Sequence, residues 1–169
     1  HASLLNPRGN INKQGIYLFF TRLAPRVFNE QDLIRRANEL ADFLVQAAGR
    51  YGRSREHMVP LGYSNGANIA AALLFVRPQL CNRAILLRPM LPLNRIKIGN
   101  IERKEILILR GTRDRVIPPE STDQLIDVLR GAGAEVTVVE VEAGHELTET
   151  DVVEANHWLA EAIKSAVTH

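Results

Sequence analysis

Short apolar runs alternate with amphipathic stretches along the chain, and this alternation is the first guide to its fold. Four of the runs are aliphatic and bounded by turn residues, which predicts strands. They are "HMVPLGY" (57–63), "RAILLRP" (83–89), "EILILRG" (105–111) and "EVTVVEV" (135–141). A further run, "ASLLNP" (2–7), predicts a strand that ends at Pro7.

The segments between these runs have the spacing of helices. From 29 to 52 the apolar residues recur every three or four positions, and Asn29 is a suitable N-cap with Asp32 three residues later. Helices are also predicted over 65–76, 119–133 and 146–166. Strands that alternate with helices predict an α/β fold, a mostly parallel sheet with helices on both faces. We expect the 169 residues to form one domain.

A serine, an acid and a histidine follow three of the predicted strands. Ser64 comes directly after the run 57–63, while Asp114 and His145 lie in the loops after the third and fourth runs. Ligands of such sheets bind outside the carboxyl ends of the strands, where we expect these side chains to meet. The three residue types can act as nucleophile, general base and the acid that orients the base. They are therefore the candidate catalytic residues.

The stretch "LGYSNGANIA" (61–70) places a glycine two positions away from Ser64 on either side. Glycine permits a sharp turn and the close approach of another segment. Gly62 and Gly66 therefore predict a strand-to-helix corner that exposes the serine hydroxyl. The alternative is an ordinary capping serine at a helix start.

Other polar residues compete with this interpretation. Glu120 is an alternative acid to Asp114, whereas Asp123 is expected inside a helix and directed away from the strand ends. His145 taken alone is typical of a surface turn. Cys81 is expected to be a partly buried turn residue, because nothing near it would lower the pKa of its thiol.

The order Ser, Asp, His along the chain is the order found in α/β-hydrolases. The sequence resembles the small carboxylesterase/phospholipase branch of that superfamily, which also holds acyl-protein thioesterase-like and dienelactone hydrolase-like proteins. The segments that carry this resemblance are "GYSNGANIAAALLF", "LLRPMLPL", "GTRDRVIPP" and "AGHELT". The stretch "PRGNINKQGIYLFFTRLAPRVFNEQDL" (7–33) is similar to a subgroup of bacterial hydrolases, some of them associated with hydroquinone response.

The resemblance implies further site residues. The backbone N–H of Asn65 should donate to the oxyanion, whereas the amide side chain of Asn65 is expected to be structural. Phe19, Phe20 and Met90 are candidates to line an acyl pocket, and core positions suit them equally well. Arg8 and Arg88 are surface candidates for contact with a polar group of the substrate.

The sequence also departs from the family pattern. In that family a strand and a His-Gly-x-Gly-Gly loop, which supplies a second oxyanion donor, come before the segment that matches residue 2. The strand would lie between the strands that match 2–7 and 57–63. We therefore expect an N-terminally incomplete hydrolase fold, either a fragment or a chain whose gap is filled by a neighbour.

Composition narrows the classes of partner. A hydrophobic fraction of 46% and a charged fraction of 24% are ordinary for a globular protein. The net charge of +2 is small and the basic residues are scattered along the sequence, so nucleic acid is not an expected partner. No apolar run has the roughly 20 residues that a membrane span needs.

The single cysteine excludes an internal disulfide and suits the cytoplasm. No residue spacing suggests a metal site, and no cofactor is expected. The sequence leaves open whether the protein forms a homodimer.

These observations predict a serine hydrolase that cleaves small or medium carboxylic esters or thioesters through an acyl-serine intermediate. Two alternatives remain open at this point. One is a non-catalytic or partner-dependent fragment that has the three residues without a complete oxyanion hole. The other is a hydrolase of lactones or of carbon–carbon bonds.

Overall fold

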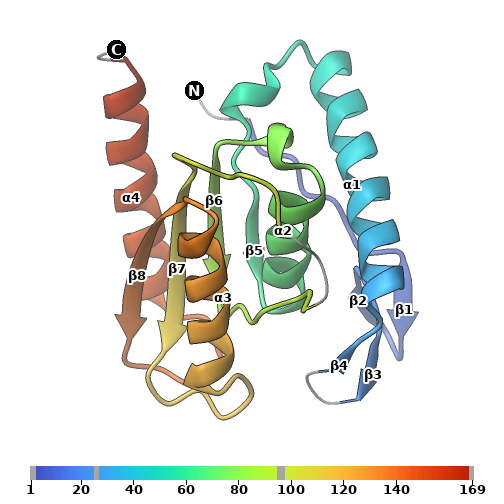
Figure 1. Ribbon diagram of the computed structural model, residues 1–169, viewed down its shortest axis with the longest axis vertical. Coiled ribbons are helices and arrows are strands. Elements are labelled where there is room, and N and C mark those ends of the chain that lie inside the picture. Colours follow the sequence, from blue (N-terminus) through green and yellow to red (C-terminus); the bar gives the residue numbers. More distant parts are fainter. Residues whose placement is uncertain (1–2, 25–26, 95–97, 168–169) are drawn as a thin grey trace.

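The computed structural model describes residues 3–24, 27–94 and 98–167. Within these residues, a four-stranded parallel sheet has the order β5-β6-β7-β8. Its strands are β5 (Leu61–Tyr63), β6 (Arg83–Leu87), β7 (Glu105–Gly111) and β8 (Glu135–Val141). The predicted limits of β7 and β8 are confirmed to the residue. All four strands run in the same direction, so their carboxyl ends meet at one edge of the sheet (Figure 1).

Two strands are shorter than predicted, for local reasons. β6 ends at Leu87 because Arg88 has a φ of 52°, outside the extended region, and a proline follows it. β5 begins only after Pro60, which has no N–H to donate to a sheet. The residues Arg55–His57 that precede it form a short 3₁₀ helix, η1, rather than a strand.

Four α-helices accompany these strands in the described part of the chain. They are α1 (Glu30–Arg50), α2 (Asn65–Val76), α3 (Pro119–Gly131) and α4 (Glu149–Val167). Asn29 caps α1 as predicted, because its side-chain oxygen accepts the N–H of Asp32 at 3.2 Å. α4 begins three residues later than expected because Thr148 and Asp151 cap it reciprocally, through bonds of 2.8 and 3.4 Å. None of the helices in the described residues is long and apolar enough to cross a membrane.

The helices cover both faces of the sheet, as predicted. Ala84 and Leu86 of β6 belong to the cluster that packs against α2 and α3, whereas Ile85 and Leu87 belong to the cluster on the other face. Ala155 of α4 closes that second cluster. Figure 1 shows α3 in front of β7 and α4 behind β8. The alternation of neighbouring residues between two apolar layers is what a sheet buried on both faces requires.

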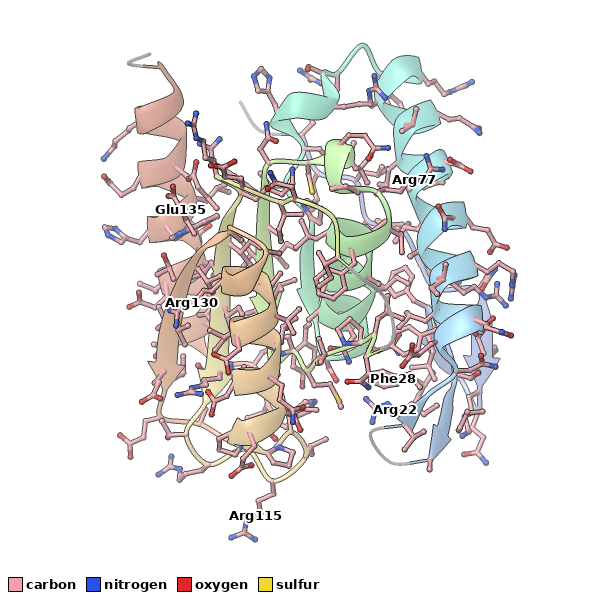
Figure 2. All side chains as sticks on the ribbon, viewed as in Figure 1. Arg22, Phe28, Arg77, Arg115, Arg130 and Glu135 are labelled. Carbon is pink, nitrogen blue, oxygen red and sulfur yellow. The ribbon has the colours of Figure 1, made fainter. Side chains whose placement is uncertain are left out.

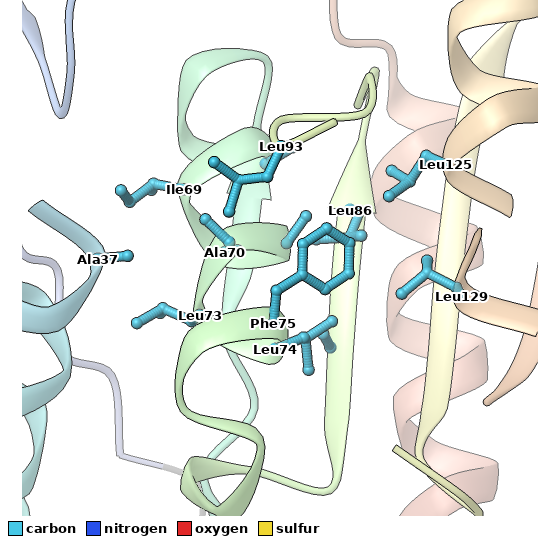
Figure 3. Packing of buried hydrophobic residues seen from close by; sticks show 14 of the residues in the cluster. Ala37, Ile69, Ala70, Leu73, Leu74, Phe75, Leu86, Leu93, Leu125 and Leu129 are labelled. Atoms are coloured by element: carbon cyan, nitrogen blue, oxygen red, sulfur yellow. The ribbon is translucent and has the colours of Figure 1, made fainter. Parts of the chain in front are cut away.

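The larger cluster joins α1 to the sheet through α2. Figure 3 shows Ala37 of α1 facing Ile69 and Leu73 of α2, with Leu125 and Leu129 of α3 on the opposite side. Each fully buried leucine or isoleucine contributes about 1.5–3 kcal/mol to the free energy of unfolding. The chain from 67 to 75 is buried throughout. α2 is therefore a central helix with no polar face.

Two small hairpins come before α1 and were not predicted from the sequence. They are formed by β1 (Ile11–Lys13) with β2 (Ile16–Leu18), and by β3 (Arg22–Ala24) with β4 (Val27–Phe28). The two-residue turn of the first hairpin, Gln14 and Gly15, has positive φ at both positions. Figure 1 shows both hairpins beside α1 at the end where the strands of the main sheet finish.

The prediction of a strand over 2–7 is wrong for residues 3–7, which have no regular structure; residue 2 lies outside the described residues. Leu4 is 94% exposed, so the apolar run that suggested a strand buries little surface. Within the described residues β5 pairs only with β6, and Leu61 of β5 is 62% exposed. β5, expected inside the sheet, therefore lies at an edge of the sheet as described.

Candidate active site

Ser64 lies at a sharp corner between β5 and α2. Its φ of 52° and ψ of −111° are unusual for a residue with a side chain, and such conformations concentrate at functional sites. A Cβ atom at Gly62 would collide with the backbone of Gly66, so only glycine permits this close packing of strand end and helix start. Ser64 occupies the cap position of α2, but its side chain makes no capping bond. The capping alternative is therefore wrong.

The side chains of Ser64, His145 and Asp114 form a continuous chain of contacts. His145 Nε2 lies 2.9 Å from Ser64 Oγ, and His145 Nδ1 lies 2.8 Å from Asp114 Oδ2. The Asp114 side chain is only 4% exposed, while 20% of the His145 side chain is exposed. Because a carboxylate can only accept, Nδ1 carries the imidazole proton and Nε2 can accept the serine hydroxyl. The three residues follow β5, β7 and β8 and are far apart in the sequence, yet their side chains meet at one edge of the sheet.

The loop after β7 aims Asp114 at the histidine. Asp114 Oδ1 accepts the backbone N–H groups of Val116 at 2.7 Å and Ile117 at 2.9 Å, which leaves Oδ2 for His145. The competing acid Glu120 lies in the exposed first turn of α3. The contacts of His145 therefore favour Asp114.

The side chain of Asn65 connects the serine corner to the two hairpins. Its Oδ1 accepts the N–H of Phe19 at 2.8 Å, and its Nδ2 donates to the carbonyl of Phe20 at 3.4 Å. The half-buried ring of Phe19 lies close to Gly66, because a Cβ atom built at Gly66 would be 4.0 Å from that ring. Phe19 therefore lies beside the first turn of α2. The structural role expected for the Asn65 amide matches these bonds.

The other predicted pocket residues belong to the core. Phe20 is fully buried and packs edge-on against Phe28 at 5.1 Å between ring centroids. Met90 is 5% exposed, and its N–H donates to Asn68 Oδ1 at 2.9 Å. Figure 2 labels Phe28 together with Arg22 on the hairpin formed by β3 and β4.

Arg88 is not a surface residue, so the expectation that it contacts substrate from the surface is wrong. It is 1% exposed and pairs with Asp151, whose side chain is fully buried, through bonds of 2.7 and 2.9 Å. The guanidinium enters the core because Asp151 satisfies its charge there. Asp151 was missed in the sequence, although Thr148 and Asp151 have the spacing of a capping box. Arg8 stacks on Tyr17, 4.1 Å from the ring centroid.

Cys81 takes no part in this site. It is 2% exposed at the end of the short 3₁₀ helix η2 (Pro78–Leu80), and it belongs to the larger core cluster. Burial raises the pKa of its thiol to about 11. A buried thiol of high pKa is a poor nucleophile, as expected, although Cys81 is almost fully buried and not partly buried as predicted.

The sequence matches a known protein family over most of its length. The profile of the phospholipase/carboxylesterase family covers residues 20–163. The MhqD protein of Bacillus subtilis (strain 168) is 38% identical over 162 residues, which are 96% of this chain and 81% of that protein.

Solved structures agree with this match. A carboxylesterase from Bacillus cereus superposes with a TM-score of 0.88 at 40% identity, over 92% of this chain and 73% of that one. A carboxylesterase from Mesorhizobium loti gives a TM-score of 0.87 at 31% identity, over 90% of this chain and 73% of that one. The chain thus belongs to the phospholipase/carboxylesterase family of the α/β-hydrolase superfamily and is a carboxylic ester hydrolase.

Proposed function

We propose that this hydrolase works through an acyl-serine intermediate, with Ser64 as nucleophile, His145 as general base and Asp114 as the acid that orients the base. The observation that carries the proposal is the chain of short contacts from Asp114 through His145 to Ser64. The strained backbone of Ser64 supports it, because the side chain is held away from a capping bond and toward the histidine.

The chemistry follows from these contacts. As Ser64 Oγ attacks the ester carbonyl carbon, its proton passes to His145 Nε2. When the tetrahedral intermediate collapses, the bond to the leaving alcohol or thiol breaks and His145 gives it that proton. Water then attacks the acyl-serine by the same route and releases the carboxylic acid. Asp114 holds the imidazole in the required tautomer and stabilises its cation throughout.

The negative oxygen of the intermediate needs donors close to Ser64. Asn65 is the first residue of α2, and N–H groups in the first turn of a helix have no acceptor within the helix. We infer that the Asn65 N–H donates to the oxyanion, where the helix dipole also favours negative charge. Loss of one such donor typically slows an enzyme by about a hundredfold to a thousandfold.

We propose a substrate with a small or medium acyl group, and the side chains around Ser64 support an apolar one. Phe19 lies beside the first turn of α2, and Asn65 holds it there. Val116 and Leu147 follow Asp114 and His145 in their loops and are 47% and 48% exposed. Apolar side chains on these loops suit an apolar acyl chain, in an ester or a thioester.

A fluorophosphonate probe tests the nucleophile directly, because it reacts with an activated serine. We expect labelling at Ser64, identified by mass spectrometry of the modified peptide. Ser64→Ala should abolish both labelling and hydrolysis of p-nitrophenyl butyrate, while Ser121→Ala, in α3, should retain both. Hydrolysis by Ser64→Ala at the rate of the unchanged protein would exclude the acyl-Ser64 mechanism.

A further inference from the structure

The loop that carries His145 is held by a side chain from another strand end. Arg88, directly after β6, donates from Nε to the carbonyl of Gly144 at 3.0 Å and from Nη2 to the carbonyl of Glu146 at 3.1 Å. These carbonyls come immediately before and after His145. A single guanidinium therefore holds the backbone on both sides of the residue whose ring contacts Ser64.

The carbonyl of His145 itself is bonded by a second side chain. The hydroxyl of Tyr63 donates to it at 2.8 Å, and the Tyr63 ring lies 5.4 Å from the imidazole between centroids. Burial raises the pKa of Tyr63, so the hydroxyl keeps its proton for this bond. Three successive carbonyls, 144 to 146, are thus fixed by two side chains.

Both side chains come from the segments that place the nucleophile. Tyr63 precedes Ser64 in the chain. Arg88 follows Leu87, whose carbonyl accepts the N–H of Ser64 at 2.9 Å. Side-chain hydrogen bonds therefore connect the serine corner to the histidine loop, although Ser64 and His145 are 81 positions apart in the chain.

The guanidinium of Arg88 is itself rigidly held. Besides the two loop carbonyls, it bonds Asp151 through both nitrogens of its fork, at 2.7 and 2.9 Å, and the carbonyl of Leu109 at 3.4 Å. The side chains of Arg88 and Asp151 are both fully buried. A bidentate pair with every donor direction in use has little freedom to rotate.

We propose that Tyr63 and Arg88 are positioning residues that set the distance between His145 Nε2 and Ser64 Oγ. The proposal rests on the proposed function, since it assigns a task to that distance. Proton transfer requires the base within hydrogen-bond reach of the hydroxyl, and misplacement by about 1 Å can cost about a hundredfold in rate. Loss of either residue should therefore lower kcat and leave KM nearly unchanged.

Tyr63→Phe is the gentler test, because it removes one hydroxyl and keeps the ring. We expect kcat for p-nitrophenyl butyrate and the rate of fluorophosphonate labelling to fall together, by about 10- to 100-fold. Tyr51→Phe, at the exposed end of α1, is the matched control and should keep both rates. In proton NMR spectra, the downfield signal of the proton between His145 Nδ1 and Asp114 should shift or broaden in Tyr63→Phe only.

Arg88→Lys keeps a cation for Asp151 and loses the fork that reaches the two loop carbonyls. Arg83→Lys is its control, because Arg83 lies at the other end of β6 and pairs with Glu105 at 2.7 and 3.1 Å, without contact to the histidine loop. We expect a fall in kcat for Arg88→Lys and none for Arg83→Lys, with circular dichroism to show that both variants fold.

The outcomes separate this proposal from the one it rests on. If Ser64→Ala is inactive while folded Tyr63→Phe and Arg88→Lys keep the unchanged kcat, labelling rate and NMR signal, the positioning role is wrong and the mechanism stands. A rise in KM with constant kcat would also overturn it, because that result places the two residues in substrate binding.

Discussion

At the scale of single residues, the nucleophile corner depends on which side chains are absent. Ser64 keeps a φ of 52° because the end of β5 and the start of α2 are packed closer than any Cβ atom would permit at Gly62. The second glycine of the motif is under less constraint, since a Cβ atom at Gly66 would meet only the ring of Phe19, at an ordinary contact distance of 4.0 Å. The two glycines are therefore alike in the sequence and different in the structure.

Gly62→Ala should accordingly be far more harmful than Gly66→Ala. The new methyl group would push the Gly66 backbone away, and overpacking of this kind costs about 1–3 kcal/mol of unfolding free energy. We expect urea unfolding to show that loss, together with weaker fluorophosphonate labelling. Gly66→Ala should change stability little, because alanine suits a helix. Equal midpoints for the two variants would contradict the close packing at Gly62.

At the scale of elements, the start of α4 connects helix capping to the base loop. Asp151 Oδ2 accepts the N–H and the hydroxyl of Thr148, at 2.8 and 2.9 Å, while the same carboxylate pairs with Arg88. The helix therefore begins at the point where the strand end of β6 and the histidine loop are tied together. Burial opposes ionisation of Asp151, yet the bonds from Arg88 and Thr148 outweigh it and keep the pKa of Asp151 below its ordinary value of 3.8.

This lowered pKa predicts how stability depends on acid. A carboxyl group whose pKa is lower in the folded state stabilises that state above its unfolded pKa, and the contribution is lost as the pH falls through the folded pKa. The free energy of unfolding should therefore decrease below about pH 4. Asp151→Asn should lose about 3–5 kcal/mol at pH 7, because it leaves Arg88 buried without its partner, and should show a flatter acid dependence.

Asp123→Asn is the control for this measurement. Asp123 pairs with Arg110 at an exposed position, where ion pairs contribute about 0–1 kcal/mol. Urea titrations at several pH values would compare the two variants. If the free energy of unfolding of Asp151→Asn fell with decreasing pH as steeply as that of the unchanged protein, groups other than Asp151 would be responsible for the acid dependence.

At the scale of the whole molecule, Cys81 reports on the integrity of the core. The thiol is 2% exposed in the cluster that joins α1, α2 and α3 to the sheet. Its pKa of about 11 leaves almost no thiolate at neutral pH. Alkylation therefore requires that the cluster open.

Iodoacetamide at pH 8 should thus modify Cys81 slowly in the folded protein, at a rate that follows the unfolded fraction as urea is added. Mass spectrometry would count the modified chains, and a short cysteine-containing peptide would give the rate for an exposed thiol. Modification at the peptide's rate without denaturant would mean that the region around η2 opens by itself, against the prediction.

Local pattern was sufficient wherever an element carries its own signal. The aliphatic runs of β7 and β8 have the predicted limits, and α2 begins and ends where the alanine-rich stretch does. The N-cap at Asn29 could also be predicted, because the hydrogen bond that defines it joins Asn29 to Asp32, only three residues away. The three candidate site residues could be found because parallel strands bring their carboxyl ends to one edge.

The sequence by itself therefore determined the α/β class, the main helices and the residues that gather at the strand ends, since periodicity and turn chemistry act over a few neighbours. Only the tertiary structure decided the rest. The strands of the two hairpins are too short for a period to show, and the first turn lacks the Asn-Gly signal. The run 2–7 looks like a strand in the sequence, but its described residues, 3–7, pair with no described neighbour. Arg88 looks like a surface cation until Asp151, 63 residues away, meets it in the core. Such contacts depend on which distant segments meet, and no local pattern encodes that.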